Sequence, residues 1–109
     1  MRENGENRSF DEMLHLLSKV QRRKLLVALL DHNPQDDSPR VVGESATETG
    51  ALSSMIEMHH AHLPKLEDYG FIVWDRDSNE VSKGPEFGEI RPLLELLRDH
   101  EDELPDGWI

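Results

Sequence analysis

Three histidines stand close together near the middle of the chain, at positions 59, 60 and 62. Imidazole is a common ligand of zinc and nickel, so three such rings could in principle bind one ion. On a helix, however, neighbouring side chains point in different directions, so the three rings cannot converge on one site unless the helix breaks at Pro64 or a second chain contributes. We therefore expect no metal and no other cofactor, with His59 packed into the core.

The chain also lacks the residue patterns of common enzymes. It contains no cysteine, which excludes thiolate metal sites and chemistry through sulfur pairs. It has no glycine-rich phosphate loop, no His-Glu-x-x-His helix and no nucleophile elbow. The many carboxylates are expected at the surface, so we expect a protein that is not an enzyme.

The only cluster of basic residues consists of Arg22, Arg23 and Lys24, at the start of an expected helix. Such a cluster can lie against a DNA backbone. It can equally form a solvated helix face. Because cations near a helix N-terminus oppose the helix dipole, a partner outside the chain is slightly favoured, although nearby carboxylates would serve as well.

The charge balance is the strongest compositional feature. The 109 residues include 23 acidic and 12 basic side chains, a formal net charge of −11 that is spread over the whole chain. This charge repels nucleic acid at low salt. Acidic surfaces keep proteins soluble in a salt-rich cytoplasm, however, and the Debye length falls to about 3 Å at 1 M salt. The net charge therefore does not exclude DNA as a partner.

Two helices are expected in the first third of the chain. Residues 1–8 are polar and are expected to be a disordered lead-in. Ser9 and Glu12 have capping-box spacing and predict a helix over residues 10–17. Ser18 is expected to cap a second helix over residues 19–31, which ends before Asn33-Pro34. Its expected core residues are Val20, Leu25, Val27, Leu29 and Leu30.

Residues 35–50, in which Val41 and Val42 are the only apolar pair, are expected to form a loop with at most one short strand or turn. A long helix should follow over residues 51–68, with a kink or break near Ala61, because Pro64 removes a backbone donor. Gly70 is expected to stop it. One face of this helix carries Ile56, His59, Leu63 and Leu66, and the opposite face carries Ser54, Met58, Ala61 and Lys65.

Strands are expected over residues 71–75 and 80–83, joined by a turn at residues 77–79. A last amphipathic helix should follow, with Pro92 opening its main segment. Its leucines exceed what a small core needs, which predicts a homodimer. The dimerisation residues would be Leu93, Leu94, Leu97 and Leu104. We expect a mainly α-helical α+β domain over residues 9–84, followed by a C-terminal helix and acidic tail over residues 85–109.

No apolar run approaches the roughly 20 residues that span a membrane, and the polar N-terminus lacks the apolar core of a signal peptide. We therefore expect a cytoplasmic protein without membrane contact.

The segment His62-Leu-Pro-Lys-Leu-Glu-Asp-Tyr-Gly-Phe-Ile-Val-Trp74 resembles the junction between recognition helix and wing in ArsR-like winged helix-turn-helix regulators. Together with the early Arg-Arg-Lys-Leu-Leu run, it is similar to small winged-helix proteins of halophilic archaea. The resemblance covers roughly Phe10 to Ile109. The metal-sensing cysteines of that class are absent. Whether residues 35–50 supply the first helix of the helix-turn-helix stays open.

This resemblance implies a homodimeric, sequence-specific transcriptional regulator that binds double-stranded DNA. The expected contacts come from the recognition helix, from Arg76 and Asn79 in the wing, and from the basic cluster. The alternative is a winged-helix module for protein–protein interaction, which gains if residues 41–50 are irregular. The expected DNA-binding residues are Ser54, Glu57, Met58, His60, Ala61, Lys65, Arg76, Asn79, Arg22 and Arg23.

Overall fold

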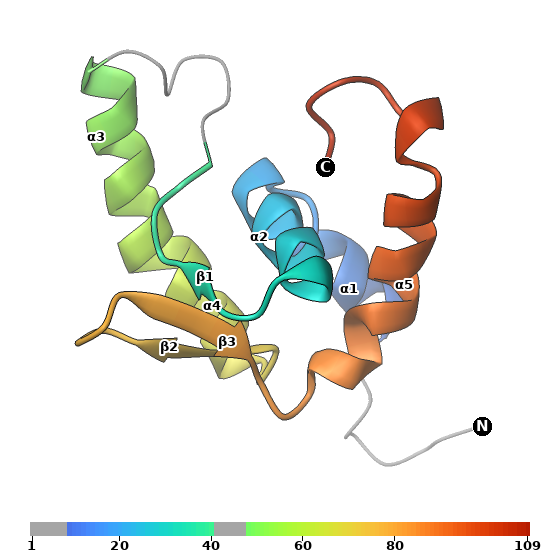
Figure 1. Ribbon diagram of the computed structural model, residues 1–109, viewed down its shortest axis with the longest axis horizontal. Helices are drawn as coiled ribbons and strands as arrows, with labels where there is room; N and C mark the ends of the chain where they lie inside the picture. Colours follow the sequence, from blue (N-terminus) through green and yellow to red (C-terminus); the bar gives the residue numbers. More distant parts are fainter. Residues whose placement is uncertain (1–8, 41–47) are drawn as a thin grey trace.

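A computed structural model describes residues 9–40 and 48–109 of the chain. The fold is α+β and mainly helical, as expected, and it contains a small three-stranded antiparallel sheet whose strand β1 lies in the expected loop (Figure 1). The expected lead-in at residues 1–8 and positions 41–47 of the expected loop lie outside the described residues. The helices are α1 (Phe10–Leu16), α2 (Val20–Asp31), α3 (Glu48–Glu57), η2 (Met58–His62), α4 (Leu63–Asp68), α5 (Phe87–Asp99) and η3 (Glu101–Glu103). The strands are β1 (Gln35–Asp36), β2 (Ile72–Asp75) and β3 (Glu80–Lys83).

The start of α1 confirms the predicted capping box. The Glu12 backbone N–H donates to Ser9 Oγ at 3.1 Å, and the Ser9 N–H donates to Glu12 Oε1 at 2.9 Å. The predicted cap at Ser18 is wrong. Its hydroxyl donates to the His15 carbonyl at 2.6 Å, at the end of α1, and Lys19 takes the cap position of α2 without a side-chain hydrogen bond. Because the Ser18 hydroxyl bonds to the end of α1, the start of α2 has no side-chain cap.

Helix α2 lies at the centre of the molecule and packs against α5 and η2 (Figure 1). Leu25 and Leu29 are fully buried, as predicted, and Val27 and Leu30 pack at the edge of the core. Leu26, which was not among the expected core residues, is also fully buried. The helix therefore needs a wide apolar face, because it has neighbours on more than one side.

The helical run from Glu48 to Asp68 contains the predicted irregularity near Ala61. It takes the form of a π-helical segment, η2, in which the Leu63 N–H bonds to the Met58 carbonyl five residues earlier. Pro64 has no N–H to continue the regular ladder, and its ring would crowd a carbonyl in the preceding turn. The wider π turn relieves this conflict and rotates the residues before it relative to those after it.

This rotation overturns part of the predicted orientation of the run. Ile56 was expected in the core and is 51% exposed, whereas Met58 was expected on the solvent face and is fully buried. His59 is half-buried at the edge of the sheet. Leu63 and Leu66 are buried as predicted.

The predicted hairpin is confirmed, with Trp74 opposite Val81 in the β2–β3 register. β1 adds to the outer edge of β3, giving the strand order β1-β3-β2. Asn79 closes the turn with a positive φ of 59°. Gly70 ends α4 as predicted, with a φ of 81°, and a Cβ atom there would lie 2.7 Å from Glu86 Cγ.

The last helix begins at Phe87, so Pro92 lies inside it rather than opening it. It ends at Asp99, so Leu104 lies beyond it. Leu94 is fully buried, and Leu93 and Leu97 pack against the same core. The prediction that Leu94 lies in a dimer contact is therefore wrong, because Leu94 is buried in the core of its own chain, whereas Leu93 and Leu97 keep part of their surface exposed.

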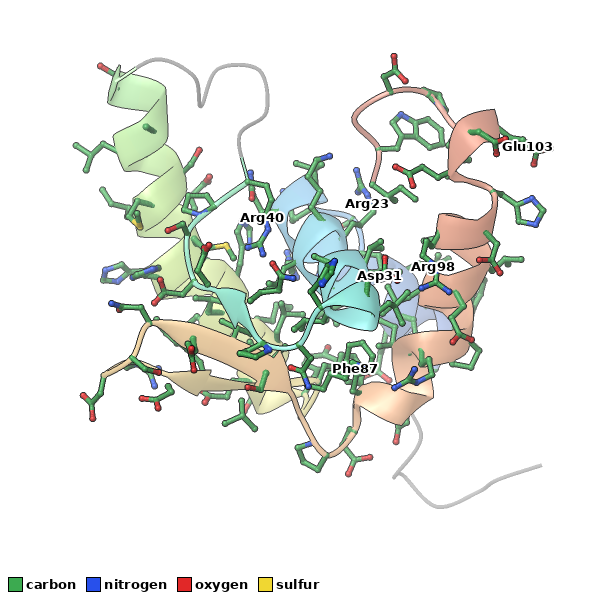
Figure 2. The ribbon with its side chains drawn as sticks, in the orientation of Figure 1. Arg23, Asp31, Arg40, Phe87, Arg98 and Glu103 are labelled. Carbon is green, nitrogen blue, oxygen red and sulfur yellow. The ribbon has the colours of Figure 1, made fainter. Side chains whose placement is uncertain are left out.

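The C-terminal residues turn back toward α2 (Figure 1). Arg23 Nε donates to the Trp108 carbonyl at 2.7 Å, and Lys24 Nζ lies 3.1 Å from the backbone oxygen of Ile109. Arg98 on α5 pairs with Asp31 on α2 at 2.7 Å (Figure 2). Among the described residues, no helix is long and apolar enough to cross a membrane.

Candidate nucleic-acid interface

Helix α3 stands away from α2 and α5, and only its C-terminal end joins the body of the molecule (Figure 1). Of the residues expected to contact DNA from this run, Glu57, His60 and Ala61 are exposed and Ser54 is partly exposed. Met58 is not available to a ligand, because it is buried in the core. The accessible part of the expected contact set is thus small and carries no permanent positive charge.

Lys65 is half-buried on α4, with its ammonium 5.6 Å from the centre of the Tyr69 ring. At this distance the cation is attracted to the ring face. The lysine is therefore held near α4, close to the base of the hairpin.

The hairpin tip carries the other expected contacts. The Arg76 guanidinium lies 3.9 Å from the centre of the Trp74 ring, and Arg76 Nη2 is 3.7 Å from Glu67 Oε1. Its side chain remains more than half exposed. Asn79 is exposed in the turn. Stacking on an indole restricts the arginine while leaving its charge accessible to solvent.

A buried network that sequence reasoning missed fixes the hairpin to the helical run. Trp74 Nε1 donates to Asp37 Oδ2 at 3.1 Å, and the Asp37 N–H donates to the Asn79 carbonyl at 3.1 Å. His59 Nε2 lies 3.1 Å from the Asp37 carbonyl oxygen, and the His59 ring meets the Trp74 ring edge-on at 5.2 Å. No local pattern marks Asp37, since its partners lie 22 to 42 residues further along the chain.

The segment that carries Asp37 is tied to α2 on its other side. The Gln21 side chain donates to the Arg40 carbonyl and accepts from the Arg40 N–H, both at 2.7 Å. Arg40 Nη2 also donates to Gln35 Oε1 at 2.9 Å. Figure 2 shows Arg40 beside α2. The hairpin, η2 and α2 are therefore joined through residues 35–40.

The expected basic cluster does not form one surface. Arg22 is 6% exposed, which makes the expectation of a solvent-facing phosphate contact wrong at this position. Arg23 Nη1 donates to the Leu17 carbonyl at 2.7 Å, in addition to the bond with Trp108, and Lys24 lies against Ile109. The physical reason is helical geometry, because consecutive residues point in different directions.

The exposed turn of the hairpin is acidic as well as basic. Asp75 accepts hydrogen bonds from the backbone N–H groups of Asp77 and Ser78, and the bonds from Ser78 and Asp77 hold the pKa of Asp75 below its ordinary value. Arg76 is thus a single cation between two aspartates. Long-range attraction to phosphate at low salt is weak for such a surface.

The described residues contain no group of three histidine, aspartate or glutamate side chains placed to hold a metal ion. Comparison of the chain with protein-family models, with curated proteins and with solved structures finds no match.

Proposed function

We propose that this chain is a winged-helix protein that binds double-stranded DNA and regulates transcription in the cytoplasm. The observation that carries the proposal is the arrangement of a projecting helix, a glycine stop and a hairpin whose tip presents Arg76 stacked on Trp74. The contacts of Asp37 with Trp74 and His59 support it, because together they hold the hairpin against the helical run.

In this proposal α3 enters the major groove and the hairpin lies along the adjacent backbone or minor groove. Ser54, Glu57, His60 and Ala61 face the base edges, and Lys65 reaches a phosphate. Arg76 and Asn79 contact the DNA from the wing. Met58 and Arg22 are not part of this surface, because both are buried.

A homodimer would present two such surfaces to successive turns of the duplex. Leu94 does not contribute to the dimer contact, since it belongs to the core of its own chain. The exposed large apolar side chains on α1 and α5 are Phe10, Leu14 and Leu96.

Fluorescence anisotropy with labelled duplexes of random sequence tests the proposal. Because the chain carries a net charge of −11, the titration is run from 0.2 to about 2 M KCl. The matched pair of variants is Arg76→Ala and Arg91→Ala, which remove one exposed positive charge from the hairpin and from α5. Binding that weakens only in Arg76→Ala supports the wing contact. Absence of binding by the wild-type chain at micromolar concentration and every salt would falsify the proposal.

A second candidate function, a protein-interaction module, is favoured by one specific observation. Leu52, Met55 and Ile56 follow helical spacing on α3, and all three are exposed. No charged residue occurs from Thr49 to Ile56, although charged residues make up 32% of the chain. An irregular conformation of residues 41–50 would also favour this function. Positions 48–50 are helical, and positions 41–47 lie outside the described residues.

The two functions differ in whether binding depends on this apolar face of α3. The double variant Leu52→Ser, Ile56→Ser changes only exposed side chains and is expected to stay folded. Under the DNA proposal it retains duplex binding within about threefold. Loss of a protein partner from the variant, with no duplex binding by the wild type, would favour the interaction module.

A further inference from the structure

Two buried polar side chains come from facing elements at the start of α2. Arg22 lies in the first turn of α2 and is 6% exposed, and His62 ends η2 and is 8% exposed. α2 and η2 pack against each other. An ionised guanidinium is costly to bury unless its donors find acceptors.

Three nitrogen atoms of this pair lack hydrogen-bond partners among the described residues. They are Nε and Nη1 of Arg22 and Nδ1 of His62, and all three are fully buried. The neighbouring side chains, in contrast, have hydrogen-bond partners. The Gln21 amide bonds to the backbone of Arg40, and the Arg23 guanidinium donates to two carbonyl oxygens. The unpartnered atoms are therefore confined to the Arg22–His62 pair.

The charges around the pair favour an anion. Burial, then Arg22, and to a smaller extent Lys19 lower the pKa of His62, with Glu57 as the opposing carboxylate. α2 begins with no acidic residue in its first turn and no side-chain cap, so the positive end of its dipole adds to these charges. Lys19 is exposed at the same helix end and lies close enough to act on the charge of His62. This positive cluster stands out in a chain of net charge −11.

The π-helical turn η2 carries His62 of the buried pair. His62 is a buried residue of this π turn, which packs against α2, and such turns recur at functional sites. Arginine is well suited to a phosphate group, since several of its donors can bond to two oxygens at once.

We propose that Arg22, His62 and the uncapped start of α2 form a binding site for a phosphate oxyanion, with Lys19 at its entrance. Arg22 donates to the oxyanion through Nε and Nη1, and His62 donates through Nδ1. The phosphate is a small ion free in solution, because Arg22 and His62 are buried and a duplex backbone cannot reach them. The site therefore does not rest on the proposed function.

Thermal unfolding in increasing potassium phosphate, with KCl added to hold ionic strength constant, tests the site. A ligand that binds only the folded chain stabilises it, and at a hundredfold excess over Kd we expect Tm to rise by roughly 5 to 15 °C. Arg22→Met should abolish this rise. In KCl alone this variant should be at least as stable as the wild type, because methionine removes a buried charge with two donor atoms that have no hydrogen-bond partner. Arg91→Met, a matched loss of an arginine on α5, should respond to phosphate like the wild type.

The NMR signal of the Arg22 Nε–H group in the wild-type chain tests the site separately from the proposed DNA contact. Inorganic phosphate should shift this signal, whereas a short duplex in KCl should leave it unmoved, because the proposed DNA contacts lie on the helical run and the hairpin. A response to free phosphate without any duplex binding supports the site and overturns the DNA function. Duplex binding that leaves the Arg22 signal unmoved, together with no response to free phosphate, overturns the site and retains the DNA function.

Discussion

Trp74 and Asp37 form a buried hydrogen bond of 3.1 Å between the indole Nε1–H and a carboxylate oxygen. Asp37 is 5% exposed, and the backbone N–H of Trp74 is held on another side by Glu67 Oε2 at 3.3 Å. Trp74 thus connects residues 35–40, through its indole, and α4, through its backbone N–H, to the hairpin. The stack of Arg76 on the same ring extends this connection to the tip of the hairpin.

Replacing Trp74 by Phe should destabilise the fold by about 2–3 kcal/mol, because it leaves a buried carboxylate without its indole donor. Urea unfolding followed by circular dichroism measures this loss. Trp108→Phe is the control, since Trp108 is 52% exposed and contributes a backbone carbonyl to its contact with Arg23. The two variants should differ by more than 1 kcal/mol, and equal stability would contradict the role assigned to the Asp37 bond.

The orientation of the helical run from Glu48 to Asp68 predicts that alanine substitutions at positions 56 and 58 differ in their effect on stability. Met58→Ala should cost about 2–5 kcal/mol, because it opens a cavity in the core. Ile56→Ala should change the free energy of unfolding by no more than about 0.5 kcal/mol, because the side chain is exposed. Denaturant titration of both variants tests the π turn, since a regular helix with the predicted face would reverse the order.

Local signals in the sequence predicted much of the fold. Ser9 and Glu12 bond to each other's backbone groups three residues apart, and Gly70 adopts a backbone angle that other residues avoid. The β2–β3 hairpin likewise follows from alternation and a turn. Each of these features depends on residues close together in the chain, which is why spacing alone was informative.

The candidate site was less predictable, because long-range contacts decide which of its side chains are accessible. Pro64 predicted a break, but the change of face at Met58 depends on the type of helical turn that relieves it. Arg22 belongs to a basic run in the sequence, yet packing of α2 on η2 buries it. Asp37 has partners on two distant elements. Spacing along one helix contains none of this information.

Removing the cation at the hairpin tip should weaken DNA binding evenly across sequences. Arg76→Ala is expected to raise Kd for any duplex by about three- to tenfold and to reduce the slope of log K against log salt by about one, as for the loss of one phosphate contact. Anisotropy titrations at four salt concentrations give both quantities. Because Arg76 stacks on Trp74, the tryptophan emission of the free protein should also change, whereas Arg91→Ala should leave slope and emission as in the wild type.

The buried position of His62 predicts a loss of stability in mild acid. Burial, Arg22 and Lys19 lower its pKa in the folded chain, so below about pH 6.5 the unfolded chain binds a proton that the folded chain excludes. The free energy of unfolding contributed by this group is therefore fully present above that pH. It falls as the pH drops toward the folded pKa, with a slope of at most about 1.4 kcal/mol per pH unit.

Urea unfolding between pH 7.5 and 5.5 measures this slope, in a range above the titration of ordinary carboxylates. His62→Gln should flatten it, whereas His100→Gln is a matched control, because His100 is an exposed residue that pairs with Glu103 at 2.8 Å. Addition of phosphate should reduce the slope of the wild type if an oxyanion beside Arg22 favours the protonated ring. A wild-type stability that stays constant across this range would show that His62 does not exclude a proton on folding.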